Sequence, residues 1–155
     1  MFVLGEAVTF YSDTLTMYFY LSSNSSQEYF PDNKPYSFRT RLDYPVSFNG
    51  EWEVALTSIN IPRLKNDYDA EYFIVKSSLC KESFFHSSQT QILDRLFPAE
   101  MKPSWTVRFP NPQYVPINTQ TTYIIDLHIY DNTGAHPSFR QGEVYCTLHI
   151  RRCQS

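Results

Sequence analysis

The fold class follows from two stretches near the end of the sequence, IDLHIY at residues 125–130 and VYCTLHIR at residues 144–151. In each stretch, aliphatic and mostly polar side chains alternate. Successive side chains of a β-strand point to opposite faces of a sheet, so a period of two indicates a strand with one buried face. We therefore expect both stretches to be strands whose aliphatic rows face an opposing sheet.

Turn residues divide the chain from residue 17 onwards into similar short segments. Residues 36–42 alternate in the same way, and Asn49-Gly50, a strong turn signal, precedes a further alternating segment at residues 51–57. Pro62 ends that segment, because proline cannot donate to a β-ladder. About eight such segments follow one another without helix–strand alternation. The pattern predicts an all-β, two-sheet antiparallel sandwich.

One region of the chain has an ambiguous pattern. The apolar residues between positions 92 and 97 fit either a short helix or a strand, and Pro98 and Pro103 keep either element brief. The order of the strands in residues 68–103 is therefore left open.

The predicted core consists of apolar residues that share one face of each alternating segment. Its members are Phe38, Leu42, Trp52, Val54, Leu56, Ile125, Leu127, Ile129, Val144, Cys146, Leu148 and Ile150.

Charge and cysteine content disfavour several classes of protein. The formal net charge is −3, and Lys and Arg do not cluster as a nucleic-acid surface requires, so no specific nucleic acid is expected. The 3 cysteines form no C-x-x-C pair, which is typical of a reducing compartment without a disulfide framework. The first residues lack the positive start of a signal peptide, and no apolar run is long enough to span a membrane. We expect a protein that is made in the cytosol and has no membrane contact.

Aromatic residues are abundant, with 12 Tyr and 12 Phe among 155 residues. Those expected in loops or at strand ends either cap the sandwich or bury area between subunits, since aromatic rings are enriched at interfaces. The candidates for an oligomer interface are Tyr29, Phe30, Tyr36, Tyr44, Phe84, Phe85 and Tyr114.

Catalytic and metal-binding patterns are weak. Asp126 and His128 share one strand face and His149 occupies the corresponding face of another strand, so the three could form a facial triad only if these strands were paired. The sequence has no G-x-S-x-G elbow and no glycine-rich phosphate loop. Glu51 and Glu53 flank Trp52 on a face expected to be exposed. We predict no enzymatic activity, no catalytic residues, no metal and no cofactor.

Two parts of the sequence resemble a known family. The first part contains FYLSSNSS at residues 19–26, YFPDN at 29–33 and GEWEVAL at 50–56. The second part contains YVP at 114–116, IDL at 125–127, DNTG at 131–134, Phe139 and residues 144–151. These stretches resemble small proteins encoded by Polinton (Maverick) elements and the related adintoviruses of invertebrates. The resemblance covers residues 17–152, but residues 68–100 match poorly. It divides the chain into an N-terminal extension at 1–16, one domain at 17–152 and a tail at 153–155.

The resemblance implies a single jelly-roll minor capsid protein of the penton type, which plugs the five-fold vertices of a virion. Its partners would be further copies of the same chain, with a pentamer favoured, and a major capsid protein. The protein would be made in the cytosol of the host cell and would act in the virion. The family supplies no catalytic residues to carry over.

Two other classes share the sandwich architecture. A trimeric ligand of the tumour-necrosis-factor type is a jelly roll of similar size, but it would need secretion or a membrane anchor. A carbohydrate-binding module would expose Trp or Tyr across one face, whereas Trp52 and Trp105 both fall within predicted strands. Both classes remain alternatives to the capsid hypothesis.

Overall fold

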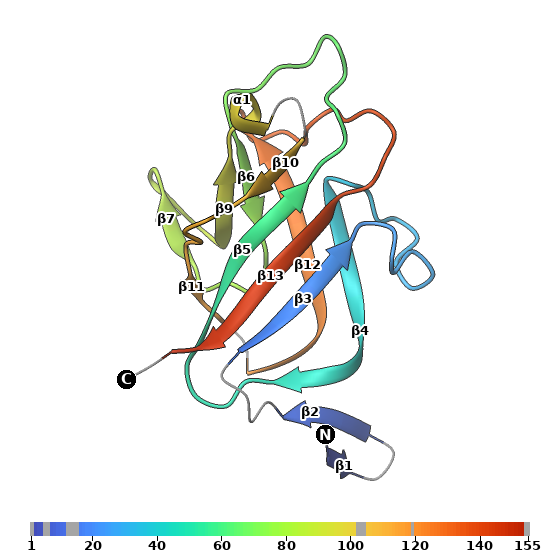
Figure 1. The fold of residues 1–155 in the computed structure, drawn as a ribbon, viewed down its shortest axis with the longest axis vertical. Coiled ribbons are helices and arrows are strands. Elements are labelled where there is room, and N and C mark those ends of the chain that lie inside the picture. The colour runs from blue at the N-terminus through green and yellow to red at the C-terminus, as the bar shows by residue number, and fades with distance from the viewer. Residues whose placement is uncertain (1, 5–6, 12–15, 102–104, 119, 154–155) are drawn as a thin grey trace.

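The computed structural model describes residues 2–4, 7–11, 16–101, 105–118 and 120–153. It is an all-β sandwich of two main sheets whose strands are paired antiparallel, apart from one short parallel pair (Figure 1). We name the sheets after their central strands, the β12 sheet and the β13 sheet. The predicted fold class is confirmed.

The β13 sheet contains the longer of the two quoted stretches. Its strand order is β10 (Thr106–Arg108), β5 (Trp52–Asn60), β13 (Tyr145–Arg152) and β3 (Thr16–Ser22), and the short β11 (Val115–Pro116) also pairs with β5. Within the described residues, β3 therefore forms one edge of this sheet. The first and last long strands of the chain lie side by side.

The β12 sheet forms the other layer. Its order is β1 (Phe2–Leu4), β2 (Ala7–Tyr11), β4 (Ser37–Ser47), β12 (Thr121–Asp131), β6 (Phe73–Lys76) and β9 (Ile92–Leu96). The pairing of β4 with β12 shifts register between Thr122 and Ile124. This shift decides which polar side chains face each other further along the two strands.

Aliphatic rows from both sheets meet between the layers. Leu127 and Ile129 of β12 and Leu148 and Ile150 of β13 are fully buried, as period-two alternation requires. Every predicted core residue is buried except Leu42, which is partly buried and packs against the core. The described core also includes aromatic and aliphatic residues outside the prediction, such as Phe73 of β6.

The Asn49-Gly50 turn connects the two sheets between β4 and β5. Gly50 has a φ of 87°, a backbone conformation in which a Cβ is strained, and an added Cβ would also lie 3.0 Å from the Arg152 side chain. Trp52 begins β5 directly after the turn and donates from its indole nitrogen to the Asn49 carbonyl at 2.9 Å.

The ambiguous region contains both kinds of element. Residues 92–96 form β9, and the single-turn helix α1 (Pro98–Met101) follows it at a proline. A hairpin of β7 (Ser83–Phe85) and β8 (Ser88–Thr90) precedes β9. The prediction that Trp105 lies in a strand is wrong, because Trp105 lies in a turn with a φ of 58°.

The N-terminal segment adds to the β12 sheet. The pair β1–β2 continues that sheet through a parallel contact between β2 and β4, and Figure 1 places it at one end of the sandwich. Positions 1, 5–6 and 12–15 of the predicted extension, and 154–155 of the predicted tail, lie outside the described residues. The connections 23–36, 61–72 and 132–144 gather toward the other end (Figure 1).

Candidate functional site

A hydrogen-bonded chain of three side chains crosses the outer face of the β12 sheet. His128 of β12 is paired directly with Ser37 of β4, and Asp126 lies two residues away on the same face. The Ser37 hydroxyl lies 2.7 Å from His128 Nδ1, and His128 Nε2 lies 2.8 Å from Asp126 Oδ2. The order Ser–His–Asp is that of a hydrolytic triad, but the two imidazole nitrogens have exchanged partners; we consider this site as the catalytic candidate among the described residues.

Asp126 is held by more than the histidine. Its Oδ1 accepts the backbone N–H of Ser78 at 3.0 Å and also the Ser78 hydroxyl. Burial acts to raise the pKa of Asp126, but the hydrogen bonds from His128 and Ser78 outweigh it, so the pKa lies below its ordinary value. The carboxylate therefore ties β12 to the segment that follows β6.

Ser37 lacks the surroundings of a nucleophile. It opens a regular strand, and its backbone N–H already donates to the Lys34 carbonyl at 3.0 Å. Acyl-transfer sites usually stabilise the oxyanion with unpaired backbone N–H groups beside the nucleophile, and the Ser37 N–H is already paired. The site places the imidazole of His128 next to a hydroxyl, and these hydrogen bonds hold neighbouring strands together.

Asp126, His128 and His149 do not form the facial triad that pairing of their strands would have allowed. His149 lies on β13, in the opposite sheet from Asp126 and His128. There it contacts the Tyr114 hydroxyl through Nδ1 at 2.6 Å, hydrogen-bonds to Thr16 and stacks on Tyr18. Burial, followed by the Arg151 charge, lowers the pKa of His149. Within the described residues, no three His, Cys, Asp or Glu side chains form a group suited to a metal ion.

The cysteines lie apart, and each is a free thiol. Burial raises the pKa of Cys80 and of Cys146 to about 12. A thiol must ionise to act as a nucleophile, so these two side chains act as small core residues.

Three of the seven predicted interface aromatics are exposed. Tyr44 lies on β4 and Phe84 on the β7–β8 hairpin, with exposed fractions of 49% and 74%. Tyr29 is 53% exposed, and the Arg41 guanidinium lies 4.4 Å from the centre of its ring. These three belong to different parts of the surface.

The other four are partly buried and make contacts within the chain. Their partners are Arg39 over Phe30 at 4.2 Å, His136 beside Tyr36 at 4.5 Å, Tyr72 near Phe85 at 6.1 Å, and Arg151 over Tyr114 at 3.5 Å. Such rings cover the sandwich, so less of their surface is left for a partner.

A set of exposed tyrosines on the β13 sheet was not among the residues predicted from the sequence. Tyr18 and Tyr20 of β3 and Tyr145 of β13 are 52%, 77% and 52% exposed. The register pairs Tyr145 with Ser22, Thr147 with Tyr20 and His149 with Tyr18, so all of these side chains share the outer face. We call Tyr18, Tyr20 and Tyr145 the tyrosine face. Alternation with Met17, Phe19 and Leu21 was the signal that could have found the first two.

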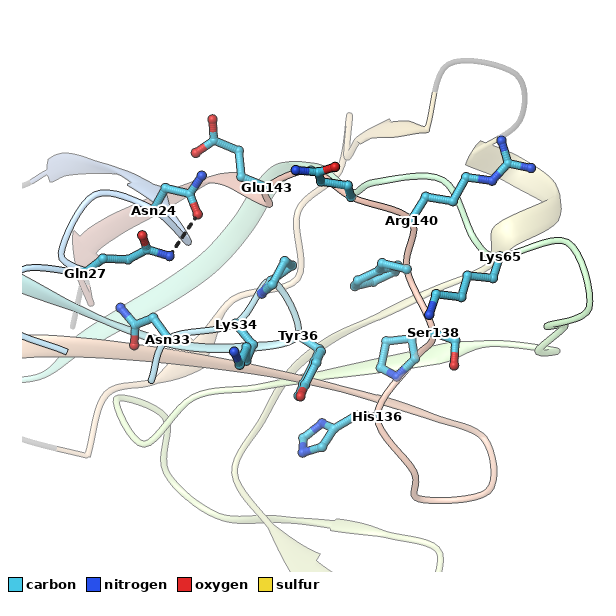
Figure 2. A pocket seen from close by; sticks show the side chains of 15 residues that line it. Asn24, Gln27, Asn33, Lys34, Tyr36, Lys65, His136, Ser138, Arg140 and Glu143 are labelled. Carbon is cyan, nitrogen blue, oxygen red and sulfur yellow. Dashed lines mark hydrogen bonds between the residues drawn. The ribbon is translucent and has the colours of Figure 1, made fainter. Parts of the chain in front are cut away.

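A hollow opens where the connections 23–36 and 132–144 approach each other (Figure 2). It has a volume of about 870 Å³, and Lys65 from the connection 61–72 also lines it. Carboxamide, hydroxyl and basic side chains make up most of its labelled lining in Figure 2. No pattern in the sequence indicated this hollow.

Comparisons with known proteins give no family. No protein-family model matches the chain, and no curated protein sequence is significantly similar to it. In the described part of the chain, no helix is both long enough and apolar enough to cross a membrane.

Proposed function

We propose that this protein is a structural subunit of a virion: a single jelly roll that associates with further copies of itself at capsid vertices. The observation that carries the proposal is the strand order. Four strands run β3-β13-β5-β10 in one sheet, and four run β4-β12-β6-β9 in the other. A jelly roll has eight strands in two such sheets, linked as two Greek keys.

The connections support the same architecture. The chain passes from one sheet to the other between β3 and β4, β4 and β5, β5 and β6, β9 and β10, β11 and β12, and β12 and β13. Crossing between sheets at nearly every step is what two interlocked Greek keys require. The resemblance to Polinton-type minor capsid proteins then supplies the role, and a major capsid protein would be the neighbouring partner.

The tyrosine face is the surface best suited to a second copy. It carries three large, exposed rings, two on the edge strand β3 and one on the neighbouring strand β13. Tyrosine buries much area at small entropic cost, and an edge strand offers unpaired backbone groups. A closed ring uses two different surfaces of each subunit, so the partner surface would lie elsewhere, with Tyr29, Tyr44 and Phe84 as candidates.

Light scattering after size-exclusion chromatography tests the proposal. We expect the full chain to form a concentration-dependent oligomer, with a pentamer as the closed form. Tyr20→Ser should weaken association about tenfold, corresponding to roughly 1.4 kcal/mol. The matched control is Tyr123→Ser, because Tyr123 is 54% exposed but lies on β12. A strict monomer at on the order of 100 μM would contradict self-association, and equal losses for both variants would contradict the role of the tyrosine face.

A further inference from the structure

The hollow between the connections 23–36 and 132–144 lies apart from the tyrosine face and needs its own explanation. Its volume of about 870 Å³ lies in the range of small-molecule sites. We infer that it binds an acidic saccharide, meaning a sugar chain that carries carboxylate or sulfate groups. This inference does not depend on self-association, since a monomer would contain the same hollow.

The wall formed by residues 23–36 is held in place by buried polar contacts. The buried Asn33 side chain donates to the Arg39 carbonyl at 2.8 Å and accepts the Arg39 N–H at 3.0 Å. The buried Ser26 hydroxyl accepts the backbone N–H of Arg41 at 3.0 Å. Both contacts fix this connection to β4, so the wall exists before any ligand arrives.

The opposite wall is fixed in a similar way. The Lys65 backbone N–H donates to the Ser138 carbonyl at 3.0 Å, and the Arg140 N–H donates to the Arg63 carbonyl at 2.7 Å. His136 Nδ1 lies 3.0 Å from the Ile129 carbonyl. A pre-formed site loses less conformational entropy on binding than a mobile loop does.

The lining suits hydroxyl groups. Asn24, Gln27 and Gln141 bring carboxamides, of which Gln27 donates to Asn24 at 3.3 Å and keeps its own acceptor, and Ser138 brings a hydroxyl. A sugar hydroxyl likewise donates and accepts, so the lining complements a ring that carries several of them. Tyr36 adds an aromatic ring, and Figure 2 shows it between Lys34 and His136.

The charge of the lining favours an anion. Lys34, Lys65 and Arg140 line the hollow, and within the described residues none of the three forms a salt bridge. Glu143 is the acidic group among the lining residues, and its carboxylate accepts hydrogen bonds from Ser22 and Tyr145. Those bonds lower the pKa of Glu143 and engage both of its oxygens. Basic groups therefore outnumber the acid, and the acid already has partners.

These features distinguish a saccharide from a simple anion or a phosphorylated peptide. An anion alone needs the basic groups but no carboxamide lining. A phosphopeptide would be expected to meet a guanidinium cluster able to bind phosphate bidentately. Here two of the basic groups in the lining are lysines, which act as point charges, and Arg140 donates to Asn66.

Calorimetric titration of the full chain tests the inference with four probes: 3′-sialyllactose, a short heparin oligosaccharide, lactose and inorganic sulfate. We expect at least one acidic saccharide to bind, with lactose and sulfate each about tenfold weaker or more. Binding of 3′-sialyllactose would indicate a carboxylate ligand, and binding of heparin would indicate a sulfated one.

Paired variants locate the site. Lys34→Gln combined with Lys65→Gln should weaken the acidic saccharide about tenfold, because two charge-assisted contacts are lost. Lys81→Gln is the matched control, since it removes an exposed lysine outside the hollow. Thermal unfolding at the wild-type temperature would show that the double variant is folded.

Several results would overturn the inference. The first is that neither acidic saccharide binds at concentrations up to on the order of 10 mM. The second is that lactose or sulfate binds as tightly as the acidic saccharides. The third is that the control variant and the double variant lose the same affinity. None of these results depends on whether the chain forms a ring.

Discussion

The outer faces of the two sheets use their polar and aromatic residues in opposite ways. On the β12 sheet, Ser37, His128, Asp126 and Ser78 form a continuous set of hydrogen bonds within the chain. On the β13 sheet, the tyrosine face leaves three large rings exposed, although Tyr145 bonds to Glu143 and Tyr18 stacks on His149. A face that satisfies its own polar groups serves stability, whereas exposed rings gain most when a partner covers them. The following predictions test this contrast.

The largest expected effect is on the β12 face. Asp126→Ala should lower the free energy of unfolding by about 2 kcal/mol, because the Ser78 N–H and His128 each lose a charged acceptor. Urea denaturation measures the change. Asp43→Ala removes an exposed carboxylate from β4 and should cost less than about 0.5 kcal/mol. Similar losses for the two variants would mean that the hydrogen-bonded chain has no special role in stability.

A smaller effect should appear in acid. The folded state lowers the pKa of Asp126, so the stabilisation is complete above the unfolded-state pKa of about 3.9 and is lost as the pH falls through the folded-state pKa. Between about pH 6 and pH 3, the wild type should therefore lose more stability than Asp126→Ala, by on the order of 1 kcal/mol. The lowered pKa of Asp131 contributes equally to both proteins. Parallel curves would show that Asp126 is not linked to folding.

The smallest expected effect is on catalysis. Because the Ser37 N–H is already bonded to Lys34, hydrolysis of p-nitrophenyl acetate should be the same for the wild type, Ser37→Ala and His128→Ala. If the wild type hydrolysed the ester and both substitutions abolished that activity, the β12 face would be an active site. The contrast between the two faces would then be wrong.

Period-two patterns predicted the strands well because they depend only on which side chains are apolar. The row at 125–130 lies in β12 and the row at 144–151 lies in β13 apart from Val144, and the aliphatic members of both rows are buried. The same patterns could not predict which polar side chains meet. His128 faces Ser37 only after the register shift near Thr122, and a one-residue slip would send every side chain to the other face.

The two surfaces proposed for binding show the same limit. The alternation at residues 17–21 places Tyr18 and Tyr20 outward, but their exposure depends on no other segment covering that face, which is a property of the whole fold. The hollow requires connections about a hundred residues apart to meet. The local sequence pattern contains no information on such long-range pairing. The resemblance to Polinton-type proteins did not help with the middle of the chain, where residues 68–100 match poorly.

The position of β3 also has a consequence for synthesis on the ribosome. In the described part of the chain, β13 is the only partner of β3, and their register joins Thr16 to Arg151. β3 must therefore wait until residues 145–151 have emerged before it can pair. During that interval the backbone N–H and C=O groups of β3 lack their native partners, so a nascent chain stalled before Tyr145 should be prone to aggregate or to recruit chaperones.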